Sequence, residues 1–257
     1  MTTTRSIVRI LMCAVFALIV CIPSSFAQQR QENRGESFAS PTFRDMAIAS
    51  VMLGAYDTDS NEVIDEYAKL MYCSLYREKF KLDFEWNNIR RELMNKIKSK
   101  REYFRTKYEI TGVVYLGRYS FETQDFPFVR NTALVNVGSL MLLNATRYVA
   151  DTSQSGCSSS AAGDEFFPLV FVFMMQQPLT LDRIKMPMDD AEKLLKQMDL
   201  MNNKERALHV RFRVRLMGSG TKNPRGPGRL MMRGELVAVD LFYDPEMTKH
   251  FASVALR

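Results

Sequence analysis

The chain has 257 residues, of which 46% are hydrophobic and 11% aromatic, so it can bury a substantial core and does not have the composition of a disordered chain. Its formal net charge of +6 permits contact with anionic partners but identifies none of them. Of its four cysteines, two lie within the first 27 residues, and the remaining two, Cys73 and Cys157, are too few for a disulfide scaffold.

The first 27 residues have the pattern of a signal peptide. Arg5 and Arg9 precede an apolar run of 13 residues, 10–22, and residues 25–27 place a serine and an alanine where a signal peptidase reads small side chains. An uncleaved membrane anchor is the weaker alternative, because the run is shorter than the roughly 20 residues that span a bilayer. We expect cleavage after Ala27 and an exported protein, periplasmic or secreted, of the bacterial envelope.

Cleavage would remove two arginines and no acids, which lowers the formal net charge from +6 to +4. No second apolar run is long enough to span a bilayer, so we expect no transmembrane segment in the mature chain. Residues 28–41 are polar and are predicted to form a flexible lead-in.

Residues 42–107 are predicted to be helical. A first helix is expected over 43–53 and a second over about 61–80, with apolar residues of the second on one stripe. A third helix begins near Asp83 and shows the clearest helical spacing of apolar residues, which are Trp86, Ile89, Leu93, Ile97 and Phe104.

Residues 108–257 change to an alternating, β-type pattern. Strands are expected at about 109–116, 118–123, 132–143 and 166–175, followed by two C-terminal strands, and a helix is expected within 186–201. The apolar run FFPLVFVFMM, 166–175, is predicted to lie in the centre of the sheet. The predicted fold is therefore α+β, with N-terminal helices packed on a mainly antiparallel sheet, one or two further helices, and residues 28–257 in one compact unit.

The segment LGRYSFETQDFPF, 116–128, concentrates aromatic residues. Alternation predicts that Tyr119 and Phe121 lie on one side of a strand, and rings at such spacing usually belong to a core. We expect them to seal the sheet against the helical half.

The segment RALHVRFRVRLMG, 206–218, alternates without error. One side carries only apolar residues, and the other carries His209, Arg211, Arg213 and Arg215, which form a cationic row about 20 Å long. The following loop and strand start add Lys222, Arg225 and Arg229 to these candidate anion-binding residues.

The next strand, about 230–243, contains only Glu235 and Asp240 as acids, so we expect that it cannot neutralise the row. Two explanations stay open. Either the row needs no ligand, because the acidic helix start at 189–192 folds over it or because it is an ordinary solvated outer face, or an external polyanion binds it, since arginine suits phosphate and carboxylate groups.

Catalytic and metal signatures are weak in this sequence. The two histidines lack the paired spacing of a zinc helix, no serine lies in a Gly-x-Ser-x-Gly turn, and the glycine-rich segment 218–228 lacks Walker spacing and fits a hairpin loop. We expect no metal and no cofactor. Cys73 and Cys157 either form one disulfide or remain a buried thiol and a loop thiol.

The run EWNNIRRELMNKI followed by YEITGVVYLGRYSFETQDFPF resembles a pattern in a family of uncharacterised exported bacterial proteins with a domain of unknown function. The resemblance covers about residues 60–130. It implies a bacterial exported domain and no catalytic residue.

We therefore expect a non-enzymatic envelope protein with a binding or assembly role, whose partner is an anionic envelope component or another envelope protein and not a nucleic acid. A hydrolase acting on envelope material is one alternative. An accessory subunit of a membrane-associated complex is another, and it would show an apolar patch, for example on the side of the FFPLVFVFMM strand.

Overall fold

The computed structural model describes residues 37–99, 104–145, 157, 166–224 and 228–254. The predicted signal peptide and Arg225 lie outside these residues. The chain divides after Ser37, and Phe38–Arg257 is one compact unit. Within the described part of the chain, no helix is both long enough and apolar enough to cross a membrane.

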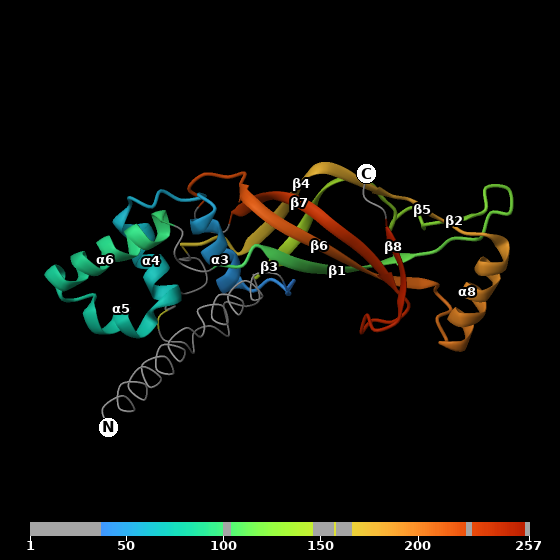
Figure 1. The fold of residues 1–257 in the computed structure, drawn as a ribbon, viewed down its shortest axis with the longest axis horizontal. Helices are drawn as coiled ribbons and strands as arrows, with labels where there is room; N and C mark the ends of the chain where they lie inside the picture. Colours follow the sequence, from blue (N-terminus) through green and yellow to red (C-terminus); the bar gives the residue numbers. More distant parts are fainter. Residues whose placement is uncertain (1–36, 100–103, 146–156, 158–165, 225–227, 255–257) are drawn as a thin grey trace, which may run out of the picture. The chain divides into compact units, whose positions relative to one another are not determined.

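The described residues form five helices and eight strands (Figure 1). The helices are α3 (Phe43–Met52), α4 (Asn61–Met71), α5 (Cys73–Lys79), α6 (Asp83–Lys98) and α8 (Met188–Leu200). The strands are β1 (Lys107–Tyr115), β2 (Asp125–Pro127), β3 (Leu134–Asn144), β4 (Val170–Leu181), β5 (Arg183–Lys185), β6 (Ala207–Ser219), β7 (Arg229–Phe242) and β8 (His250–Val254). An α+β fold is therefore confirmed.

The prediction of one helix over 61–80 is wrong, because the helix breaks at Tyr72, whose φ of −132° and ψ of 47° are not helical. The two halves pack differently, since α4 has four buried residues and α5 has none. Val63, Ile64, Tyr67 and Ala68 of α4 enter the core, while Tyr76 of α5 packs edge-on against Trp86 of α6, with ring centroids 5.3 Å apart.

The main sheet has six strands in the order β1-β6-β7-β4-β3, with β8 also paired to β7. The predicted mainly antiparallel sheet is wrong, because the sheet is mixed: β4 runs parallel to β7, with Val170 beside Arg229 and Met175 beside Gly234. The chain passes through β5, α8 and β6 between these two strands, and such a long crossover can bring it back in the parallel direction. Strand β4 is paired on both sides, as predicted for this apolar run.

The aromatic segment 116–128 also departs from the prediction. Residues 118–123 form no strand, only a bridge between Ser120 and Asp125 around a turn. Tyr119 is half-buried and donates a hydrogen bond to the carbonyl of Met186 at 2.8 Å, whereas Phe121 is 73% exposed. We expected this segment to pack against the N-terminal helices, but it packs with α8 in the second core instead.

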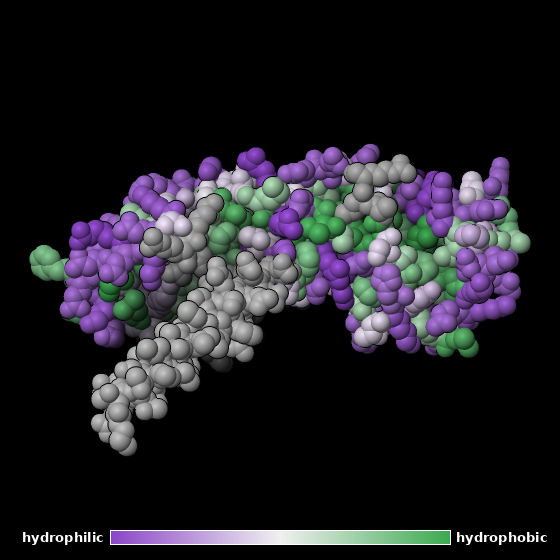
Figure 2. All heavy atoms as spheres, in the orientation of Figure 1, coloured by the Kyte–Doolittle hydropathy of each residue, from purple (hydrophilic) through white to green (hydrophobic). Residues whose placement is uncertain are grey.

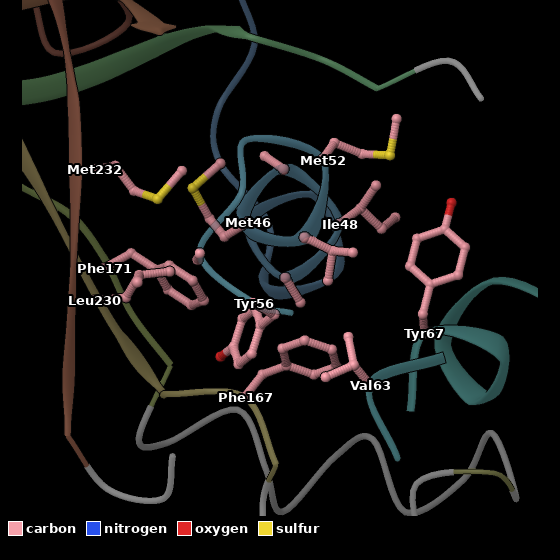
Figure 3. Packing of buried hydrophobic residues seen from close by; sticks show 14 of the residues in the cluster. Met46, Ile48, Met52, Tyr56, Val63, Tyr67, Phe167, Phe171, Leu230 and Met232 are labelled. Carbon is pink, nitrogen blue, oxygen red and sulfur yellow. The ribbon is translucent and has the colours of Figure 1, made fainter. Parts of the chain in front are cut away.

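Two hydrophobic cores lie on the sheet. In the first, α3 is buried on nearly all sides, and Figure 3 shows its Met46 on the side of Phe171, Leu230 and Met232 of the sheet, while Ile48 lies on the side of Tyr67 of α4. The second core joins α8, Phe126 and Phe128 to the other end of β6 and β7. The inner face of the sheet is thus covered at both ends.

Residues 38–41 are not a free lead-in, which corrects the prediction for this part of 28–41. Ala39 forms a parallel bridge with Tyr108, and the N–H of Glu109 donates to the carbonyl of Ala39 at 2.9 Å. The ring of Phe38 lies 5.9 Å from Nζ of Lys107 and 5.7 Å from Cζ of Arg213. The segment therefore extends the β1 edge of the sheet.

Gly234 lies where β7 passes closest to its neighbours. A Cβ atom at this position would be 2.0 Å from the carbonyl oxygen of Arg215 and 2.8 Å from Cε2 of Phe173. Neither the neighbouring backbone nor a buried ring can move away easily, so the position requires glycine.

Asp244 closes the turn between β7 and β8. Its carboxylate accepts hydrogen bonds from the hydroxyl and N–H of Thr248, at 2.6 and 3.0 Å, and from the N–H of Lys249 at 2.6 Å. Desolvation acts to raise the pKa of this carboxyl, but the hydrogen bonds outweigh it and lower the pKa from 3.8 to about 2.

Candidate functional site

The outer face of the sheet is the side opposite the two cores, and it carries the predicted cationic row. Along β6, Leu208, Val210, Phe212, Val214 and Leu216 are buried in the cores, while the alternate residues point to the other side. The predicted alternation is confirmed, and His209, Arg211, Arg213 and Arg215 share one face.

Each arginine of the row has a carboxylate close by, so the expectation that the neighbouring strand cannot neutralise the row is wrong. Nη1 of Arg215 lies 2.7 Å from Glu235, and Nη1 of Arg213 lies 3.4 Å from Asp240. Nε of Arg211 lies 3.6 Å from Glu109, at ion-pair distance but without a hydrogen bond.

The register of the strands places these carboxylates beside the row, and only the Arg215–Glu235 pair is directly opposed, while the other two pairs are diagonal. Glu235 is directly opposite Arg215, Asp240 is opposite Arg211, and Glu109 on β1 is opposite Arg213. Sequence analysis found both acids of β7 but could not know that the register aligns them with the row. The acidic start of α8 does not cover it, because α8 packs in the second core on the inner face of the sheet, where Asp190 and Glu192 pair with lysines of their own helix.

Asp240 also joins the row to β8, which the sequence did not predict. Its Oδ1 accepts a hydrogen bond from the hydroxyl of Ser253 at 2.7 Å, and Nε2 of His250 lies 3.2 Å from that hydroxyl oxygen and 3.9 Å from Oδ1. Asp240 is only 7% exposed. Because the serine proton points to Asp240 and not to His250, this group acts as a clamp between strands and lacks the geometry of a serine nucleophile with its base.

Three further cations lie on the outer face. Lys107 on β1 is opposite Arg215, while Arg229 and Arg233 lie on β7, two residues before and two residues after Met231. None of these three cations forms an ion pair with another residue of the described part of the chain. The outer face of β1, β6 and β7 therefore carries six lysines and arginines against three carboxylates among the described residues.

The predicted loop cations are not gathered into one site. Nζ of Lys222 donates to the carbonyl of Gly54 at 2.8 Å, which ties the hairpin loop to the segment after α3. Arg225 lies outside the described residues, and Arg229 is exposed at the start of β7. Of the two that the structure describes, Arg229 lies on the outer face.

A strip of apolar residues, which we call the methionine strip, lies beside these cations: Met141, Val172, Met174, Met217 and Met231. In register, Met231 on β7 is next to Val172 on β4, and Val172 is next to Met141 on β3. Met141 is 48% exposed and Met217 is 56% exposed. The strip includes outward residues of the FFPLVFVFMM strand, but sequence analysis missed it because its members come from four strands.

Cys73 and Cys157 are joined by a disulfide, with Cα atoms 5.6 Å apart, so in this structure Cys73 is not a free thiol nucleophile. In the described ranges, no group of three or more histidine, cysteine, aspartate or glutamate residues is placed to hold a metal ion. The outer face thus offers cations and apolar side chains for binding. Its contact between Ser253 and His250 belongs to the group that links β7 to β8 through Asp240.

Comparison with known proteins identifies the family. The model of the family described as domain of unknown function DUF4852 matches residues 59–197, more than half of the chain. This range runs from α4 into α8 and leaves out β6, β7 and β8. No curated protein and no solved structure matches the chain. The chain belongs to the DUF4852 family, which confirms the expected resemblance to a family with a domain of unknown function.

Proposed function

We propose that this protein is a non-enzymatic exported envelope protein that binds a negatively charged partner on the outer face of its sheet. The observation that carries the proposal is the excess of cations on that face, six against three carboxylates among the described residues of β1, β6 and β7. The signal-peptide pattern of residues 1–27 supports an envelope location.

The exposed cations without a carboxylate partner in the described ranges are best placed to meet an anion. Arg229 and Arg233 are exposed, and residues four apart on a strand lie roughly 13 Å apart. Each guanidinium can donate two parallel hydrogen bonds to a carboxylate or phosphate group. The row arginines add positive potential but already contact carboxylates, so we expect them to contribute less.

The test compares two double variants that lose the same charge. Arg229→Gln with Arg233→Gln removes the exposed cations of β7, and Lys193→Gln with Lys196→Gln removes two exposed lysines of α8. The probes are vesicles containing anionic phospholipid and immobilised polyglutamate, each with increasing NaCl. We expect the arginine variant to elute at clearly lower salt than the lysine variant.

Equal shifts in the two variants would mean that net charge alone causes retention, and this would refute a site on the outer face. Unchanged retention of the arginine variant would refute it as well. Circular dichroism of both variants provides the control for folding.

A further inference from the structure

The methionine strip lies outside both hydrophobic cores. Met141, Met174, Met217 and Met231 belong to neither core, although inner-face residues beside them, such as Met232, are fully buried. Figure 2 shows hydrophobic residues interspersed with hydrophilic ones on the side of the molecule that it draws. Met141 and Met217 are about half exposed, Met174 and Met231 are half-buried, and Val172, between Met141 and Met231, is only 8% exposed, so the methionines form the accessible part of the strip.

Cations border the strip along β7. Arg229 and Arg233 lie on either side of Met231 on the same face, and Arg233 is in register with Met174 on β4. On β6, Met217 follows the half-exposed Arg215, and its sulfur accepts a hydrogen bond from Nε2 of Gln176 at 3.7 Å. Apolar and cationic groups therefore form one continuous surface.

We infer that the methionine strip and its bordering arginines dock a segment of a partner protein that carries apolar side chains flanked by carboxylates. The inference rests on the proposed function and names the class of partner. Unbranched methionine side chains adapt to differently shaped apolar groups, which suits a docking surface. Charge complementarity requires acids on the partner, beside the groups that cover the strip.

This occupant fits better than the other anionic candidates. A charged polymer has no apolar groups that could contact the strip. A lipid surface binds apolar groups that project into it more strongly than side chains that lie along a sheet between arginines. A second copy of this chain would bring the same arginines against each other. The charged polymer is the alternative that the polyglutamate probe of the test below represents.

The test uses two probes of equal charge: an amphipathic peptide with leucine and glutamate on one face, and polyglutamate without apolar residues. Binding to the mature protein is measured by fluorescence anisotropy. Met141→Ser with Met217→Ser should weaken peptide binding about tenfold, because two half-exposed side chains no longer contribute buried apolar area. Polyglutamate binding should not change.

The matched control is Met188→Ser with Leu200→Ser on α8, where the two side chains are 56% and 84% exposed. It should leave peptide binding unchanged. Oxidation by hydrogen peroxide gives a second readout: Met217 and Met188 are each 56% exposed, and bound peptide should protect only Met217.

Peptide binding that is no tighter than polyglutamate binding, or equal protection of Met217 and Met188, would overturn this inference. The proposed function would still stand if polyglutamate binding depended on Arg229 and Arg233. Loss of that arginine dependence for both probes would instead count against the proposed function itself.

Discussion

Replacing Asp240 with alanine tests whether the central arginine of the row is first of all a structural group. Asp240 is 7% exposed and connects three strands, through Arg213 on β6 at 3.4 Å and Ser253 on β8 at 2.7 Å. Alanine removes both contacts and leaves Arg213 beside a small apolar side chain. The free energy of unfolding should therefore fall.

The size of the loss follows from burial. A hydrogen bond to a charged group contributes about 1.5–3 kcal/mol, and breaking a buried ion pair costs about 3–5 kcal/mol. The Arg213 side chain is 35% exposed, so water can compensate for part of the lost contact. We expect a loss of about 2–3 kcal/mol. For Glu235→Ala, which breaks a pair whose side chains are 41% and 45% exposed, we expect about 0–1 kcal/mol.

Urea denaturation at neutral pH, followed by circular dichroism, measures both losses. Hydrogen exchange adds a local readout, since the amides of β8 should exchange faster in Asp240→Ala and not in Glu235→Ala. Equal losses in the two variants, or a larger loss for Glu235→Ala, would refute the argument from burial. So would unchanged exchange in β8.

Asp244, Gly234 and the disulfide each give a further prediction. The pKa of Asp244 is 3.8 when unperturbed and about 2 in the folded protein, so the stability that its ionised carboxylate contributes is present above pH 4 and is lost as the pH falls towards 2. The thermal midpoints of wild type and Asp244→Asn should therefore converge between pH 4 and pH 2. A difference between the two midpoints that stays constant over this range would contradict the prediction. Gly234→Ala should lower the free energy of unfolding by about 3 kcal/mol or more. The control is Gly138→Ala, where the added Cβ meets no atom within 4 Å and no such loss is expected. Similar urea midpoints for the two variants would contradict the close contact of Gly234 with Arg215 and Phe173. Reducing the disulfide between Cys73 and Cys157, 84 residues apart, should destabilise the protein by about 2–4 kcal/mol, and an unchanged thermal midpoint in dithiothreitol would contradict that role.

Periodic patterns predicted much of the secondary structure. The helical spacing of Trp86, Leu93 and Ile97 indicated α6, and the alternation of 206–218 indicated β6 with its two faces. The short strands β5 and β8, of three and five residues, were missed because so few residues show no period.

The candidate site was only half predictable, since its second half depends on register. The arginines of β6 follow from alternation within one segment. Their carboxylate partners and the methionine strip depend on which residues of distant strands stand side by side, and a parallel β4–β7 pair is not visible in either strand alone. Replacing all three row arginines together should therefore lower stability, because Asp240 would stay buried without its partner.

The position of β7 has a consequence for how the protein is made. This strand pairs with β6, β4 and β8, so the β3–β4 hairpin and the β1–β6 pair have no strand to join them until residues 229–242 have been synthesised. A nascent chain shorter than this would expose the unpaired edges of β4 and β6, where other chains can add. Completion of this sheet should therefore wait for β7 and be limited by contacts between residues far apart in the chain.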